Sequence, residues 1–338
     1  MQKIDQAVSN KLAKMSFLCA LMVVVLHVCS GPDWIGKVLA IKGIAVQFFF
    51  LAAGYLFAGR MGEEGWYGRQ VKSRVKSLLV PYVVWNVAYA IFMVGLSEAA
   101  RHFGVSWGFA TSWDGLCRQN VGILGLNPLG FPSLGLLWFV RCLIVFAVVS
   151  PIFLLWTKRR GWILAVLFAC VQLAYVILFP EPTEGPWQPN WLGNAWLRAV
   201  TYFGAGVWLR FNASGGFRIR RAEAVLVLAL GWTLLAVDNK VCGWIGTPIA
   251  MAGLWYSLSG EAWNKMLTSC AFPIYLLHLF WAWPVASLAS VLGLKEWFAA
   301  SAIAWAIKWS IMAGGSVLTA LLLRRFCPRF AAVVFGGR

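Results

Sequence analysis

Acidic side chains are scarce in this chain, and all of them fall in loops or at the ends of the long apolar runs. The 338 residues include 12 Asp and Glu against 29 Lys and Arg, for a formal net charge of +17 at pH 7. Proton-coupled carriers place carboxylates within their membrane helices, so this scarcity disfavours that class of protein. The excess of positive charge alone would suit a nucleic-acid partner, but the positions of the basic residues give it another origin.

The chain also lacks the sequence patterns of several other functions. Its eight cysteines occur singly, without C-x-x-C spacing, and this disfavours a metal or redox site. No G-x-x-x-x-G-K-S/T loop is present, which disfavours an ATP-driven pump. Nor is there an internal repeat of the kind that many secondary transporters show. We therefore expect no metal and no resident cofactor.

What the chain has in excess is apolar surface. Hydrophobic residues make up 61% of it, charged residues 12%, and the mean hydropathy is +0.74 with 21 Trp. This composition is typical of a polytopic membrane protein. Apolar runs of roughly 17 or more residues predict an all-α transmembrane bundle of about ten helices. The predicted spans are 16–32, 38–59, 78–97, 134–156, 162–179, 191–209, 222–238, 241–259, 269–293 and 298–323.

The basic residues indicate the orientation of this bundle. With a cytoplasmic N-terminus, most Lys and Arg outside the spans lie in cytoplasmic segments, as the positive-inside rule requires. Both termini are then cytoplasmic, and no nucleic acid is expected as a partner. We interpret residues 1–338 as one integral membrane domain without a separate soluble domain. The inner membrane of a bacterium is the expected setting.

Five ionisable side chains fall inside predicted spans, where burial is costly and a functional role is the default hypothesis. We infer a polar cavity that accepts an anionic ligand or is closed by outer-loop acids such as Asp33 and Asp114. Two alternatives stay open: a neutral histidine that bonds a neighbouring helix, and arginines that extend to the outer headgroups. The five residues are His27, Arg141, Arg198, His278 and Lys308.

Four segments, in this order along the chain, resemble the membrane acyltransferase-3 family. They are similar to a Phe-rich second helix, a basic-then-Pro-Tyr entry to the third helix, a Leu-Trp-Phe helix and a Tyr-Leu-x-His helix. The resemblance spans most of the chain and implies a protein that transfers acyl groups, commonly acetyl, onto sugars and other acceptors at the cell envelope. The segments are FFFLAAGYLF (48–57), RVKSLLVPYVVWN (74–86), LLWFVRCLIVFAVVSP (136–151) and AFPIYLLHLFW (271–281).

The resemblance also implies a role for His27, because the family's first helix carries an Arg and, after ten residues, a His regarded as catalytic. His27 matches this His, but Ser16 occupies the position of the Arg. Lys14 is a poor geometric substitute, since a helix places it roughly 140° away from His27 around the axis. The cationic helper is therefore expected from another helix, with Arg74 and Arg141 as alternatives.

Acyl transfer to a hydroxyl needs a base, groups that stabilise an oxyanion, and a site for the donor's phosphates. His27 is the predicted base, because histidine titrates close to neutral pH. Tyr275 and His278 are three residues apart on one helix, so both can orient an acceptor or stabilise the oxyanion. Arg141 completes the predicted catalytic set. Bonding between helices is the alternative role of Tyr275 and His278.

Acyl-CoA, with acetyl-CoA as the expected form, is the predicted co-substrate and would approach from the cytoplasm. Arg74, Lys72 and Lys76 are the predicted ligands of its phosphates, and Trp138 covers the site. The alternative is that these cations only follow the topology rule.

The expected function is acyl transfer to a hydroxyl of an envelope sugar or lipid-linked glycan, with membrane lipid around the protein. A transporter or flippase of an anionic lipid or sugar is the rival, since intramembrane cations would line its path. A catalytically inactive scaffold of the same fold is the third alternative, because the family arginine is missing at Ser16.

Overall fold

The computed structural model describes residues 4–28, 32–102, 135–178, 189–213, 219–237 and 239–337, and in these ranges all secondary structure is helical, as predicted. The shorter 3-10 and π turns are η1 (Ala40–Ile44), η2 (Ala58–Arg60), η3 (Val75–Leu79), η5 (Gly135–Leu137), η6 (Ser150–Phe153) and η7 (Arg159–Gly161). The α-helices are α1 (Gln6–His27), α2 (Asp33–Val38), α3 (Ala45–Phe57), α4 (Trp66–Arg74), α5 (Val80–His102), α7 (Trp138–Val148), α8 (Leu154–Thr157), α9 (Trp162–Leu178), α10 (Pro189–Asn212), α11 (Arg221–Ala236), α12 (Lys240–Ser257), α13 (Lys265–Thr268), α14 (Ala271–Val291), α15 (Lys295–Ala300), α16 (Ala302–Phe326) and α17 (Pro328–Val334).

Every predicted span contains a helix, but not every helix is long and apolar enough to cross a membrane. Six stretches of the described chain are, and a seventh would be the bent pair Gly135–Val148 and Ser150–Thr157. α10, α11 and α12 fill the remaining predicted spans but are not among these stretches. Ten spans with two cytoplasmic termini therefore stay a prediction. The six stretches are Gln6–His27, Ala40–Arg60, Trp66–Ala99, Arg159–Leu178, Ala271–Val291 and Ala302–Phe326.

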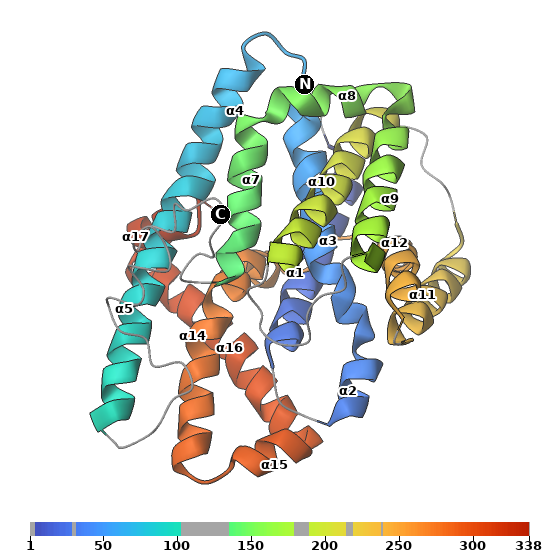
Figure 1. The fold of residues 1–338 in the computed structure, drawn as a ribbon. Helices are drawn as coiled ribbons and strands as arrows, with labels where there is room; N and C mark the ends of the chain where they lie inside the picture. Colours follow the sequence, from blue (N-terminus) through green and yellow to red (C-terminus); the bar gives the residue numbers. More distant parts are fainter. Residues whose placement is uncertain are drawn as a thin grey trace. The chain divides into compact units, whose positions relative to one another are not determined.

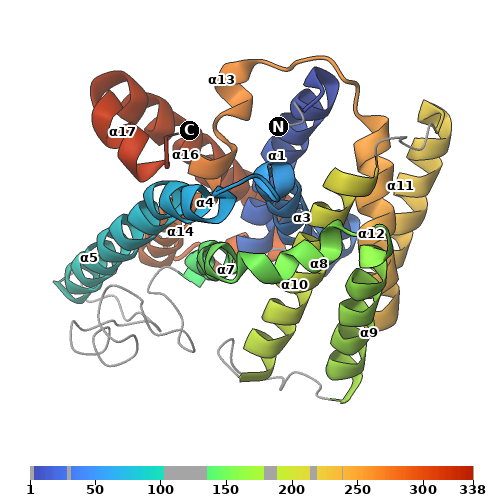
Figure 2. The same ribbon diagram turned by 90° about the horizontal axis from the view of Figure 1, so that it is seen from above.

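The chain divides into two compact units, and helices α1, α2, α4 and α7 each contribute residues to both. In the first unit α10 packs along α3 and α9, and α11 packs along α12 (Figures 1 and 2). In the second unit α14 packs along α16, while α17 packs on α5 and α16 (Figure 1). The first unit comprises 1–23, 36–72 and 145–269, and the second comprises 24–35, 73–144 and 270–338.

Close packing of α3 on α10 depends on glycines. A Cβ atom at Gly54 would overlap the carbonyl oxygen of Phe203, and one at Gly206 would overlap that of Leu51. Small residues let two membrane helices approach until their backbones touch, and this packing drives their association. These contacts therefore set the distance between α3 and α10 in the first unit.

Gly54→Ala is expected to destabilise the protein by about 1–3 kcal/mol, because the added methyl group forces α3 and α10 apart. The readout is the apparent melting temperature in detergent. Gly95→Ala on α5 is the matched control, since no atom lies within 4 Å of a Cβ atom there. That change is expected to be neutral or slightly stabilising, because alanine favours the helix over glycine. Equal melting temperatures for the two variants would contradict the prediction.

The predicted span 134–156 is not one straight helix. Its two parts, Gly135–Val148 and Ser150–Thr157, differ in direction by 80°. Pro151 has no N–H to donate to the carbonyl of Ala147, and the Ser150 hydroxyl donates to that oxygen instead, at 2.8 Å. The apolar pattern continues through this point, and for this reason the bend did not appear as a boundary in the sequence.

The basic segment between the second and third predicted spans, which contains Lys72, Arg74 and Lys76, is helical too. α4 leads through the π turn Val75–Leu79 into α5. Pro81 cannot donate to the Ser77 carbonyl as an α-helical residue would, and a π turn is one way in which a helix absorbs such a defect.

The chain's C-terminal segment packs against this π turn. Gly336 has φ +66°, and a Cβ atom there would overlap the Ser77 carbonyl oxygen. Trp85 of α5 donates its indole N–H to the carbonyl of Val334 at 2.8 Å and stacks on Phe335. These contacts fix the end of α17 against the start of α5.

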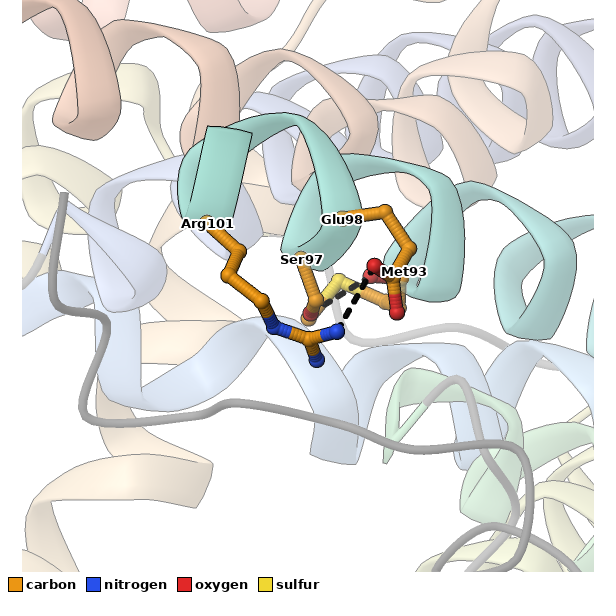
Figure 3. A network of polar contacts seen from close by, with 4 residues as sticks. All are labelled: Met93, Ser97, Glu98 and Arg101. Atoms are coloured by element: carbon orange, nitrogen blue, oxygen red, sulfur yellow. Dashed lines mark hydrogen bonds and ion pairs between the residues drawn. The ribbon is translucent and has the colours of Figure 1, made fainter. Parts of the chain in front are cut away.

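α5 extends one turn beyond its predicted end at residue 97. In this turn the Arg101 guanidinium and the Glu98 carboxylate form an ion pair at 2.8 Å, and the Ser97 hydroxyl donates to the carbonyl of Met93 (Figure 3). Pairs three residues apart stabilise a helix surface. Both charged side chains are more than half exposed. This end of α5 is therefore a polar extension of an apolar helix.

Candidate active site

The two predicted site histidines, His27 and His278, lie against each other in the second unit. His27 lies on the last turn of α1, and His278 lies on α14 with no exposed surface. Their ring centroids are 5.1 Å apart, with a tilt of 41° between the ring planes. Because two positive charges at this separation repel strongly, the pair holds at most one extra proton when buried. The packing thus brings together the two groups best able to move a proton.

The hydrogen bond of His278 defines which of its nitrogens carries a proton. Nδ1 lies 2.9 Å from the carbonyl oxygen of Ile274, one turn earlier on α14. A carbonyl oxygen only accepts, so Nδ1 donates and Nε2 of the neutral ring presents a lone pair. Nε2 is buried and has no hydrogen-bond partner among the described residues. His278 therefore offers a buried hydrogen-bond acceptor.

Tyr275 is also buried, and it joins α14 to the start of α7. Its hydroxyl donates to the carbonyl of Leu136 in η5, and its ring contacts Phe139 edge-on at 5.7 Å. This is the bond between helices that was the alternative role of Tyr275. Its expected catalytic role stays a prediction.

Arg141 of α7 is buried, with 7% of its surface exposed. A side chain that reached the outer headgroups would be more exposed, so burial argues against that alternative. Arg141 interacts electrostatically with Tyr82 of α5, and Tyr82 is hydrogen-bonded to the side chain of Asn86. Trp138, one turn before Arg141, is half-buried. The second unit thus places a cation, a phenol and an amide between α7 and α5.

Tyr82 and Asn86 were not among the predicted site residues. Asn86 has no exposed surface, and Tyr82 has 2%. Their spacing of four residues on an apolar helix puts both on one face, and a buried amide in a membrane helix needs a polar partner. That spacing was the available signal, and it lies within the segment RVKSLLVPYVVWN.

The other predicted cations have different positions. Lys72 and Lys76 are exposed on either side of half-buried Arg74, the last residue of α4. Arg198 lies in the first unit, within electrostatic reach of Tyr202. Lys308 is buried and is the seventh residue of α16, so it lies within this helix and not in the segment before it. Asp33 is exposed, while Asp114 lies outside the described residues.

Lys14 forms hydrogen bonds and a cation–π contact with residues of the first unit. Its ammonium group donates to the carbonyl and to the hydroxyl of Ser259, at 3.1 and 2.8 Å, and lies over the Trp263 ring. Lys11 donates in the same way to the carbonyl of Trp255. Both lysines thus bind carbonyls at and beyond the C-terminal end of α12, where a cation is stabilised. This accounts for the burial of Lys14 without a catalytic role.

The chain matches a family model described as an acyltransferase domain, that of the acyltransferase-3 family, over residues 17–325. The chain belongs to the acyltransferase-3 family. This membrane protein is therefore an acyltransferase, as the four segments indicated. No curated protein and no solved structure matches it. The match begins directly after Ser16 and ends before α17, so the helix packed on the π turn lies outside it.

In this acyltransferase the second unit contains His27 and His278 together with Arg141 and Tyr275. Sites of three or more His, Cys, Asp or Glu side chains that could hold a metal ion are absent from the part of the chain that the structure describes. The second unit thus holds two histidines that can transfer protons and a buried cation.

Proposed function

We propose that the protein transfers an acyl group, with acetyl as the expected one, from acyl-CoA to a hydroxyl of an envelope sugar or lipid-linked glycan precursor. The observation that carries the proposal is the contact between the rings of His27 and His278, in a unit that also contains Arg141. Family membership supports the reaction class. The cell membrane, in a bacterium the inner one, is the proposed location.

The proposed reaction is a direct transfer with His27 as general base. His27 accepts the proton of the acceptor hydroxyl while the hydroxyl oxygen attacks the thioester carbonyl carbon, which forms a C–O bond and an oxyanion. Collapse of this intermediate breaks the C–S bond. The protonated His27 returns its proton to the leaving thiolate, so the products are the ester and CoA with a free thiol.

The cations supply the remaining parts of the proposal. Arg141 stabilises the negative charge that develops on the carbonyl oxygen, a role that a buried cation performs better than an exposed one because little water screens it. Arg74, Lys72 and Lys76 bind the phosphates of the donor, and Trp138 covers the site. Exposure of Lys72 and Lys76 suits a contact with a soluble nucleotide.

The test is acyl transfer by the purified protein in detergent, with radiolabelled acetyl-CoA and an extract of envelope glycans. We expect label to appear in the glycan fraction. Absence of transfer with acetyl-CoA and with longer acyl-CoA donors would refute the proposal and favour the inactive scaffold. Proteoliposomes test the rival class separately: movement of labelled lipid or sugar without an acyl donor would favour the transporter.

A further inference from the structure

The proposed mechanism assigns no step to His278, the second histidine of the pair. His278 is fully buried, its Nδ1–H is bonded to the Ile274 carbonyl, and its Nε2 lone pair has no hydrogen-bond partner among the described residues. A buried acceptor without a partner is costly, so a donor is expected to occupy it during the working cycle. The neighbouring ring, His27, has a suitable N–H, and its centroid lies 5.1 Å from that of His278.

The separation of the rings suits that bond. When two imidazole nitrogens face each other at an N···N distance of about 2.9 Å, the ring centroids lie about 5 Å apart. The observed separation is 5.1 Å. His27 is half-buried on the last turn of α1, and in the proposed arrangement a rotation of its side chain brings one of its ring nitrogens to face Nε2 of His278.

We propose that His278 is a positioning residue, which accepts the ring N–H of His27 at Nε2 and so presents the other His27 nitrogen to the acceptor hydroxyl. The Ile274 carbonyl in turn positions His278, because it accepts the N–H at Nδ1 and so keeps the proton of the neutral ring on that nitrogen. In this way a backbone carbonyl, His278 and His27 form a chain that selects one tautomer of the base. The inference rests on the proposed function for its activity readout, but its tautomer readout is independent.

Two substitutions separate this role from a purely structural one. In His278→Gln the side-chain carbonyl can take the place of Nε2 and accept from His27, while the bond to Ile274 is lost. In His278→Asn the side-chain amide can replace Nδ1 and donate to Ile274, while the acceptor is lost. We expect His278→Gln to retain acyl transfer within about tenfold and His278→Asn to lose about 10²-fold, as misplaced catalytic groups do.

Other results would overturn the assignment. Higher activity in His278→Asn than in His278→Gln would mean that the bond to Ile274 matters and not the acceptor. Activity of both variants as low as that of His27→Ala would mean that His278 itself moves a proton, and full activity of both would mean that it has no role. His102→Asn is the matched control, since His102 is exposed at the end of α5.

A measurement without turnover keeps the test decisive if a variant fails to fold. The chain has three histidines, so the ring nitrogens of 15N-histidine-labelled protein can be assigned with two spectra, those of His102→Asn and His278→Asn. We expect neutral His278 protonated at Nδ1, and a shift in the tautomer of His27 in His278→Asn. Protonation of His278 at Nε2 would refute this inference alone. A wild-type protein that transfers no label would refute the proposed function, and the tautomer readout would still apply.

Discussion

His27→Ala is expected to lower the rate of acyl transfer by about 10²–10⁴-fold, the usual contribution of a general base. In the proposed mechanism the variant removes the base that accepts the hydroxyl proton, and water is a far weaker base. Binding of the donor should change little, because the proposed phosphate ligands lie elsewhere in the sequence. The loss is therefore expected in kcat and not in KM, measured with labelled acetyl-CoA over a range of concentrations.

The matched control for His27→Ala is His102→Ala, which removes a histidine from the exposed end of α5. This variant is expected to transfer acyl groups at the wild-type rate. Equal melting temperatures of the two variants in detergent would show that the loss is chemical. Unchanged transfer by His27→Ala would exclude His27 from the mechanism.

Arg141→Gln is expected to lower kcat by about 10²–10³-fold, or roughly 2.7–4 kcal/mol of transition-state stabilisation, as removal of an oxyanion ligand does. Glutamine keeps a polar side chain but removes the positive charge next to Tyr82. Arg141→Lys retains the charge without the planar fork and is expected to recover part of the rate.

Arg101→Gln is the control for this substitution, because Arg101 is exposed and its ion pair with Glu98 contributes little. Kinetic constants and melting temperatures of all three variants give the comparison. A reduced melting temperature with a normal kcat for Arg141→Gln would assign Arg141 a structural role next to Tyr82 and remove it from catalysis.

Several features of the site could be predicted because they are local in the sequence. His27, Arg141 and His278 were conspicuous as ionisable residues within apolar runs, where burial is costly. The spacing of Tyr275 and His278 also showed that both lie on one side of α14. Such patterns do not show which residue each side chain contacts, because the contacting residue comes from another helix.

Tyr275 illustrates this limit. The sequence allowed it either an acceptor ligand or a bond between helices, and the structure has its hydroxyl on the Leu136 carbonyl. Lys14 is similar: its angle around α1 made it a poor helper for His27, but the Ser259 oxygens that bind it lie far away in the chain. Neither partner is visible in local spacing, since Leu136 and Ser259 are distant in the sequence from the side chains that they bind.

By itself the sequence determined the class of the protein: an all-helical membrane chain of the acyltransferase-3 family. Hydropathy is a property of each run of residues, and the family segments are short contiguous patterns, so neither needs tertiary information. Only the tertiary structure decided that His27 lies against His278, that Arg141 faces Tyr82 and that the span at Pro151 bends. A membrane helix is apolar on its lipid side and on its protein side, so its pattern does not reveal which face meets which neighbour. The rotation of each helix about its axis and its packing in the bundle decide which face meets which neighbour.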